Sequence, residues 1–142
     1  MRDQERNWIS QHQRSAFTKT FRNFALACWI RGFYTRFLIV KKNKKTIARI
    51  AFLSSEDVKN LSVNINNNNN NDCILECNYG RGENFYSRYF YFRCAKDGLY
   101  LYKIVGTHFI PDSDKKIIIK RYIHPQINIK KINFLYYLEN TP

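Results

Sequence analysis

Short runs of apolar and aromatic residues alternate with polar turns along most of the chain. The last third shows the pattern most clearly, because residues 99–105, 117–122 and 127–132 are rich in Ile, Val, Tyr and Leu. Between these runs, residues 111–114 and 124–125 carry Pro, Asp, Ser and His in combinations that favour turns. This part of the chain is therefore predicted to form a compact antiparallel sheet with a cationic surface.

The middle of the chain continues the strand pattern. Residues 33–53 contain two apolar runs, YTRFLIV and TIARIAFL, and the polar KKNKK between them has the length of a hairpin loop. Further short strands are predicted at 58–65 and 73–77. The asparagine tract at 66–71 cannot bury apolar surface, so we expect a solvated loop there.

Two segments show the spacing of a helix. Residues 15–30 bring Phe17, Phe21 and Phe24 onto one helical face, which predicts a basic amphipathic helix near the N-terminus. Residues 83–96 are ambiguous, because the spacing of their aromatic residues suits a helix whereas the density of those residues suits a strand. We predict a helix for this second segment.

Together these elements predict an α+β protein made of two small antiparallel sheet-plus-helix units. We place a basic N-terminal helical extension at residues 1–35, the first unit at 36–97 with an asparagine-rich loop at 64–72, and a second, β-rich unit at 98–142. A weak internal repeat favours two units, since FLIVKKNKKTIARIAF and FIPDSDKKIIIKRYI share one layout. Each is an apolar run, a turn with paired lysines and a second apolar run.

Charge is the strongest pointer to function. The chain has 24 Lys and Arg against 11 Asp and Glu, which gives a formal net charge of +13. A small domain needs a net charge of only about 2 to 8 in magnitude for solubility, so this excess favours a polyanionic partner. Nucleic acid ranks ahead of an anionic membrane surface. We expect no membrane-inserted segment, because no apolar run reaches spanning length.

The sequence offers little catalytic chemistry. Cys73, Cys77, Cys94 and His108 could in principle bind zinc, but their spacing matches no standard zinc motif. Buried, reduced thiols in an intracellular compartment are the preferred interpretation. No carboxylate pair, activated nucleophile or phosphate-binding loop stands out. We therefore expect no enzymatic activity, no metal, no cofactor and no small-molecule substrate.

Several motifs occur in an order that resembles a known family. Residues 40–45 (VKKNKK), the strand pattern at 46–52 and the acidic-then-valine step at 56–58 follow one another. This order resembles the first of the two small α/β domains in the ribosomal protein L6 family of the large subunit. In that family the turn reads Val-Lys-Gly-Pro-Lys-Gly, so both of its glycines are lysine in this chain.

The second domain of that family resembles the later part of the chain. The matching parts, in the family's order, are GL at 98–99, VGTHF at 105–109, KKIIIK at 115–120 and RYIHP at 121–125. His108 and Arg121 stand where the family has glycine. The family's last helix and basic tail have no counterpart here, so the second unit corresponds to a domain truncated on its C-terminal side.

The resemblance implies a structural constituent of the large ribosomal subunit. Its partners would be large-subunit rRNA and neighbouring ribosomal proteins. The high content of Asn, Ile, Lys, Tyr and Phe suits an AT-rich genome, so we expect a mitochondrial or other organellar ribosome, with the cytoplasm as the alternative.

Basic residues in turns and strands are the candidate RNA contacts, because Lys and Arg neutralise phosphates and release counterions. Gly106 would allow close backbone approach or would be a β-bulge glycine, and His124 would contact a phosphate or a 2′-OH or would only satisfy its own turn. Arg88 and Arg93 lie among aromatic residues that would form either a stacking platform or, as we expect, core. The candidate RNA-binding residues are Lys41, Lys42, Lys44, Lys45, Gly106, Lys115, Lys116, Lys120, Arg121, His124, Lys130 and Lys131.

Two alternative functions stay open. Residues 26–39, LACWIRGFYTRFLI, resemble the latter half of an IQ motif, and Trp29, Phe33 and Leu38 fit a one-five-ten anchor pattern for calmodulin-type light chains. That interpretation needs a helix through residues 33–40, where the strand pattern predicts a hairpin. The other alternative is a nucleic-acid-binding module outside the ribosome.

Overall fold

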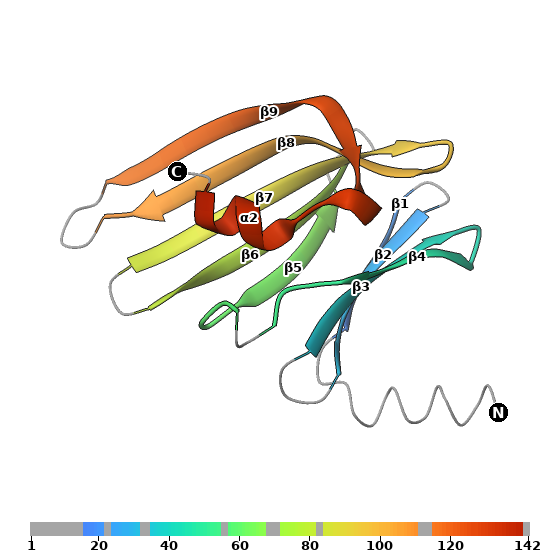
Figure 1. Cartoon of the computed structure of the whole chain (residues 1–142), viewed down its shortest axis with the longest axis horizontal. Helices are drawn as coiled ribbons and strands as arrows, with labels where there is room; N and C mark the ends of the chain where they lie inside the picture. Colours follow the sequence, from blue (N-terminus) through green and yellow to red (C-terminus); the bar gives the residue numbers. More distant parts are fainter. Residues whose placement is uncertain are drawn as a thin grey trace.

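Two antiparallel sheets contain most of the chain (Figure 1). The computed structural model describes residues 16–21, 24–31, 35–54, 57–67, 72–81, 84–110 and 115–140. The four-stranded sheet has the order β1-β2-β3-β4, with β1 (Ala16–Phe21), β2 (Phe24–Arg31), β3 (Thr35–Lys42) and β4 (Lys45–Ala51). The five-stranded sheet has the order β5-β6-β7-β8-β9, with β5 (Ser62–Asn67), β6 (Asp72–Arg81), β7 (Asn84–Ala95), β8 (Gly98–Phe109) and β9 (Lys116–Asn128).

Two short helical segments follow the last strand. They are the 3₁₀ helix η1 (Ile129–Lys131) and the helix α2 (Phe134–Asn140). Figure 1 shows α2 lying across one face of the five-stranded sheet. Neither segment is long and apolar enough to cross a membrane.

The α+β prediction is therefore wrong: within the described residues the fold is nearly all β, and its α-helix is a single short one. The expected N-terminal helix at 15–30 is instead β1 and β2. Phe17 and Phe21 belong to β1 and Phe24 to β2, so the helical spacing of these aromatics arises across the connection between two paired strands. Residues 1–15 of the predicted extension lie outside the described part of the chain.

The helix predicted at 83–96 is also wrong, because this segment is β7. Arg88, Phe90 and Phe92 are buried while Tyr89 and Tyr91 between them are half-buried, which is the two-residue period of a strand. Aromatic and β-branched residues fit the pleated surface between two neighbouring strands. Pairing with β6 and β8 on either side therefore decides between the two readings of this segment.

Several predicted strands are confirmed. The hairpin is β3 and β4, and its KKNKK loop places Asn43 and Lys44 at φ of 50° and 67°, as tight hairpin turns require. The strand runs at 99–105 and 117–122 are parts of β8 and β9.

The turns and loops expected between these strands differ from the prediction. His124 and Pro125 were expected to form a turn but lie inside β9, joined by a cis peptide bond. An edge strand tolerates proline, because the missing N–H is not needed by a further neighbour. The asparagine tract begins within β5, and its residues 68–71, like the predicted turn at 111–114, lie outside the described residues.

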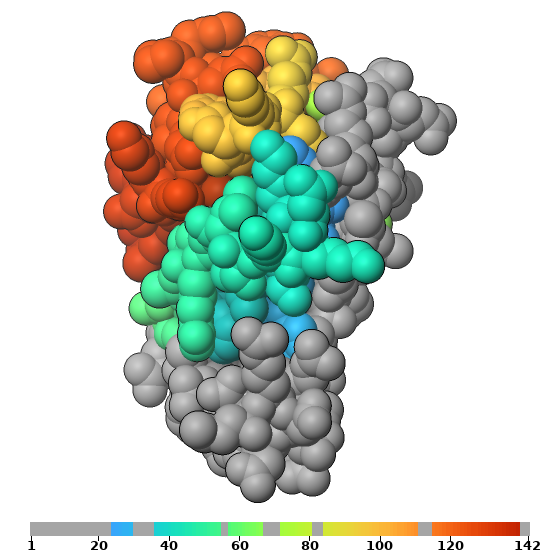
Figure 2. All heavy atoms as spheres, turned by 90° about the vertical axis from the view of Figure 1, so that its right-hand side faces the viewer, coloured from blue at the N-terminus to red at the C-terminus, as the bar shows by residue number. Residues whose placement is uncertain are grey.

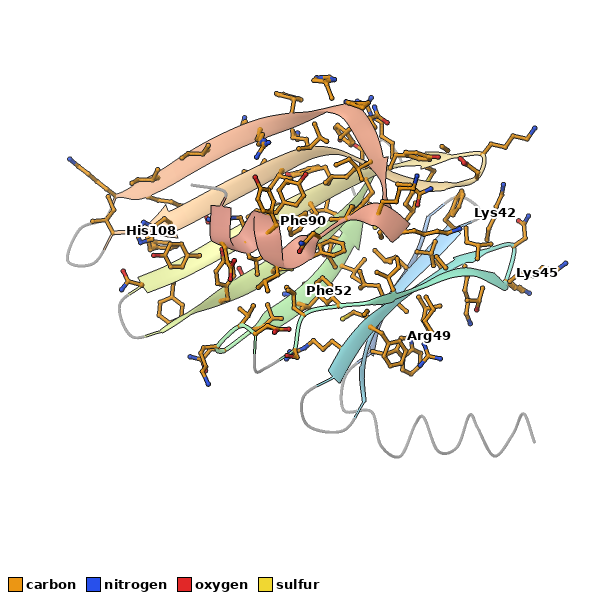
Figure 3. The ribbon with its side chains drawn as sticks, viewed as in Figure 1. Lys42, Lys45, Arg49, Phe52, Phe90 and His108 are labelled. Carbon is orange, nitrogen blue, oxygen red and sulfur yellow. The ribbon has the colours of Figure 1, made fainter. Side chains whose placement is uncertain are left out.

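One hydrophobic cluster joins the two sheets and α2. It includes Leu38 from the four-stranded sheet, Leu75 and Phe90 from the five-stranded sheet, and Leu138 from α2. Phe90 and Phe52, which follows β4, both contact the ring of Phe134 (Figure 3). The face of the five-stranded sheet that packs on α2 is called the inner face below, and the opposite face is called the outer face.

Candidate nucleic-acid interface

The outer face of the five-stranded sheet carries a row of alternating aromatic and basic side chains. The strand register places Tyr91 of β7 directly across from Lys103 of β8, and Lys103 directly across from Tyr122 of β9. In the next row, Tyr89 is across from Val105 and Val105 from Lys120. Residues directly opposite on adjacent strands project from the same face, so the two rows form one surface.

A β-bulge in β8 adds a further ring to this surface. Tyr91 pairs with Lys103 and Phe92 pairs with Leu101, which leaves Tyr102 as the extra residue between β7 and β8. The register with β9 shifts at the same point, where residues 123–126 of β9 lie between the partners of Leu101 and Lys103. A bulge of this kind lets two successive side chains face the same way. Tyr102 and Lys103 accordingly both contact the Tyr91 ring. The centroids of the Tyr102 and Tyr91 rings are 6.2 Å apart, and Lys103 Nζ lies 4.1 Å from the Tyr91 centroid.

Cations lie over the aromatic rings of this face. The Arg93 guanidinium is 4.0 Å from the centroid of the Tyr102 ring, and Lys103 Nζ is 5.9 Å from the same centroid. Tyr122 is 60% exposed, and Arg93 and Lys120 are exposed as well. Tyr102 itself is 8% exposed and lies beneath these cations, so the rings that the face presents are those of Tyr122 and the half-buried Tyr91. Exposed rings together with positive charge are the combination that binds bases and phosphates of an unpaired strand.

The acidic side chains of the outer face lie on β6 and are held by neighbours. Glu76 Oε2 accepts hydrogen bonds from Asn64 Nδ2 at 3.1 Å and from Asn78 Nδ2 at 2.8 Å. The Asp72 carboxylate accepts a hydrogen bond from the Tyr102 hydroxyl. The negative charge of this face is thus concentrated at β6, and the positive charge on β7, β8 and β9.

Two tyrosines of this face, Tyr102 and Tyr89, hold their hydroxyl protons more tightly than usual. Burial, followed by the hydrogen bond to Asp72, raises the pKa of Tyr102 well above its usual range. Burial and the nearby Glu76 also raise the pKa of Tyr89. Both rings therefore stay uncharged and do not repel a polyanion.

The structure divides the predicted stacking platform between the two faces. Tyr89, Tyr91 and Arg93 lie on the outer face, whereas Arg88, across from Gly106 and Cys77, lies on the inner face. The Arg88 side chain is 2% exposed, its guanidinium is 5.8 Å from the ring centroids of both Tyr79 and Tyr86, and burial lowers its pKa. Half of the platform is therefore core, as expected, and the other half is surface.

The predicted RNA-binding residues fall into separate groups. One group lies on β9 and just before it. Lys120 lies on the outer face beside Tyr122, and Lys116 Nζ lies 5.7 Å from the ring centroid of Phe109. Lys115 is exposed. Arg121 projects to the inner side, where its guanidinium is 5.8 Å from the Tyr137 ring. The strand register thus brings Lys120 to the candidate interface and directs Arg121 away from it.

A second cationic group lies at the tip of the β3–β4 hairpin. Lys41, Lys44 and Lys45 are exposed there, and Lys42 Nζ donates a hydrogen bond to the backbone carbonyl of Lys96 in the β7–β8 turn. Figure 2 shows this hairpin beside that turn, and Figure 3 shows Lys42 and Lys45 at the same end of the molecule. This group is separate from the aromatic row of the outer face.

The remaining predicted residues lie elsewhere. Lys130 and Lys131 are exposed on η1, and His124 is exposed on β9. Gly106 is buried in β8 between Arg88 and Ile119, so its backbone is not presented to a ligand. None of these four residues belongs to the aromatic row.

Sequence reasoning missed Lys103, Tyr102 and Tyr122 as site residues. The alternation of residues 99–105 and 117–122 could have assigned Lys103 and Tyr122 to a solvent-facing side, but it could not show which rings would be their neighbours. Tyr102 was beyond prediction, because a bulge breaks the alternation that assigns side chains to a face.

Metal-ligating and nucleophilic side chains are the remaining candidates for chemistry among the described residues. No three of their His, Cys, Asp and Glu side chains are placed to hold a metal ion. Cys28, Cys73 and Cys77 are buried thiols, and burial raises the pKa of Cys28 to about 11 and those of the other two further. A thiol whose pKa is raised in this way is a poor nucleophile at neutral pH.

Comparison with protein-family models, curated proteins and solved structures gives no match to this chain. Membership of the ribosomal family therefore stays a prediction from short motifs. The fold that the resemblance implied, two small α/β domains, is not the fold observed.

Proposed function

We propose that this protein binds single-stranded nucleic acid across the outer face of its five-stranded sheet. RNA is the expected form, because the resemblance in the sequence points to a ribosomal setting. The observation that carries the proposal is the row Tyr91, Lys103 and Tyr122, in which a cation lies between two rings on successive strands. A net charge of +13 supports the same partner.

The spacing of the row suits unpaired bases. Strands β7 and β9 are separated by two strand intervals, so the Tyr91 and Tyr122 backbones lie roughly 10 Å apart. Stacking of a base on such a ring contributes about 1 to 3 kcal/mol and does not depend strongly on sequence. Lys103 and Lys120 would meanwhile contact phosphates, so binding should weaken steeply with salt.

The calmodulin-type alternative loses its structural basis. It needs residues 26–39 on one exposed helix, but β2 and β3 pair side by side there, with Leu26 opposite Val40. Leu26 and Leu38 are both 0% exposed. Binding in a helical form would require the four-stranded sheet to come apart.

Membership of the large ribosomal subunit is a narrower proposal, with a mitochondrial or other organellar location. It does not follow from the outer face, which would serve an rRNA loop and a free RNA equally well. Sedimentation of a native lysate through a sucrose gradient separates the two. Migration with the large-subunit rRNA at high salt would support the ribosome, and migration at the top would leave a free RNA-binding module.

The binding proposal itself is tested by fluorescence anisotropy with a labelled 12-nucleotide single-stranded RNA. We expect tighter binding to this strand than to its duplex, and single-stranded DNA of the same sequence serves as the comparison for RNA preference. Tyr91→Ala and Tyr122→Ala should each weaken binding by about tenfold through lost stacking.

The matched control is Tyr136→Ala. Tyr136 is 47% exposed on α2, so this variant removes an exposed tyrosine from the opposite side of the sheet. Equal affinity for duplex and single strand, or equal losses in all three variants, would contradict a stacking interface on the outer face.

A further inference from the structure

The strand β9 forms the edge of the five-stranded sheet and pairs with β8 alone among the described strands. Figure 1 shows β9 along the rim of the sheet. Its exposed apolar side chains include Ile117 at 46%, Ile118 at 55% and Tyr122 at 60%. An edge strand presents backbone N–H and C=O groups that a further strand can pair with. Such a strand, with apolar side chains on both of its faces, is a site for strand addition.

The order of charges along β9 identifies a partner strand that fits it. Suppose that a second β9 lies antiparallel to the first, with Ile119 opposite the same residue of the other copy. Ile118 then lies opposite Lys120, Ile117 opposite Arg121, and Lys116 opposite Tyr122. In this register every cation from Lys116 to Arg121 faces an apolar or aromatic residue, and no cation faces another.

The neighbouring registers that also keep the two outer faces on one side bring like charges opposite each other. A twofold axis at Ile118 would place Lys116 opposite Lys120 of the other copy, and an axis at Lys120 would place the two Lys120 side chains opposite each other. Like charges directly opposite each other on adjacent strands are destabilising. The axis at Ile119 is therefore the register that satisfies both the charges and the apolar side chains.

We propose that two copies of this protein pair edge to edge through antiparallel β9 strands about a twofold axis at Ile119. The interface is isologous and closes on itself, so it yields a dimer and not a filament. Because the axis is perpendicular to the sheet, both outer faces lie on the same side. Lys120 and Tyr122 of the two copies then form one continuous surface.

The dimer has a salt dependence that distinguishes it from nucleic-acid binding. Two chains of net charge +13 repel each other at low ionic strength, and salt screens that repulsion. We therefore expect dimerisation of the full chain to strengthen between about 0.05 and 0.5 M salt. Nucleic-acid binding should weaken over the same range.

Sedimentation velocity of the purified chain without nucleic acid tests the dimer. A species of twice the 17.1 kDa chain mass should grow with concentration and with salt. Ile118→Lys places a cation opposite Lys120 twice per dimer and should weaken association several-fold, whereas Ile118→Glu places a carboxylate there and should strengthen it. Tyr136→Lys and Tyr136→Glu make the same charge changes away from the edge and should leave association unchanged.

Cross-linking tests the register. Under oxidation, Ile119→Cys should form a disulfide between copies, because the two positions are directly opposite and close enough for the bond. In Ile117→Cys the two thiols lie four residues apart along the strands, roughly 13 Å, and should not cross-link.

Other outcomes would overturn the proposal. A chain that is monomeric at every concentration and salt, or that assembles without limit, excludes a closed dimer. Equal cross-linking of the two cysteine variants would exclude the axis at Ile119.

Discussion

The ring of Phe90 meets the ring of Phe134 edge to face, with centroids 5.1 Å apart and planes at 73°. Phe134 also contacts Phe52 in the same way, at 4.9 Å and 85°. At the N-terminal end of α2, Asn133 Oδ1 accepts a hydrogen bond from the Tyr136 N–H at 3.1 Å. A seven-residue helix is not stable alone, so these aromatic contacts hold α2 in place.

Phe90→Ala should lower the free energy of unfolding by about 3 to 5 kcal/mol, because it removes a fully buried ring and leaves a cavity beneath α2. Urea denaturation followed by circular dichroism measures this. Phe85→Ala on the same strand is the control, since Phe85 is 53% exposed and should change stability little. Similar decreases in the free energy of unfolding for the two variants would contradict a central role of Phe90 in the core.

Gly80→Ala should destabilise the β6–β7 hairpin. Gly80 has φ of 143°, and an added Cβ would lie 1.9 Å from the carbonyl oxygen of Asn84, which belongs to the paired strand. The backbone strain alone costs about 1 to 3 kcal/mol, and the clash adds to it.

Gly98→Ala is the comparison for Gly80→Ala. Its φ of 157° is also positive, but the nearest atom to its added Cβ, Asn128 Nδ2, is 3.4 Å away. Thermal unfolding should therefore show a larger fall in Tm for Gly80→Ala. An equal or smaller fall would mean that the hairpin yields to the added methyl group.

Stability should fall at alkaline pH. Burial raises the pKa of Cys28 from 9.0 to about 11 and that of Tyr79 from 10.0 to about 12. The folded chain keeps these protons above the pH at which the unfolded chain loses them. The unfolded chain then binds fewer protons, so the free energy of unfolding decreases as pH rises from 9 to 12.

Urea unfolding at a series of pH values measures this slope. Cys28→Ala should make it shallower between pH 9 and pH 11, the interval between the two pKa values of that thiol. The same change at the half-buried Cys94 should leave the Cys28 contribution in place. A slope that is the same in wild type and Cys28→Ala would contradict the assignment.

The two cationic groups should differ in their effect on salt dependence. In Lys103→Gln/Lys120→Gln, two cations are removed from the outer face, and the slope of log affinity against log salt should fall by roughly 1.4 if each contacts one phosphate of a single strand. Lys44→Gln/Lys45→Gln removes the same charge from the hairpin tip and should leave the slope nearly unchanged. The reverse result would move the interface to the hairpin.

The β3–β4 hairpin was predictable because its signal is local. Two apolar runs and a polar loop lie within a few residues of one another, and Asn43 supplies the positive φ that the turn needs. Strand β8 and the first part of β9 were predictable for the same reason, whereas the turn expected at 124–125 lies inside β9.

The rest depends on neighbours that are distant in sequence. The aromatics of β7 have the spacing of a helix and the composition of a strand, and pairing with β6 and β8 decides between them. The candidate interface draws Tyr91, Lys103 and Tyr122 from three strands and needs both their register and the bulge at Tyr102. A single linear sequence does not contain that register in readable form.

The position of α2 also affects how the chain can fold during synthesis. The core cluster includes Phe24 of β2 near one end of the described chain and Phe134, Tyr137 and Leu138 of α2 near the other. In a nascent chain that has left the ribosome only as far as β9, the strands of both sheets can pair, but α2 is not yet present to cover Phe90. The aromatic inner face therefore stays exposed to other chains and to chaperones until these α2 residues leave the ribosomal tunnel.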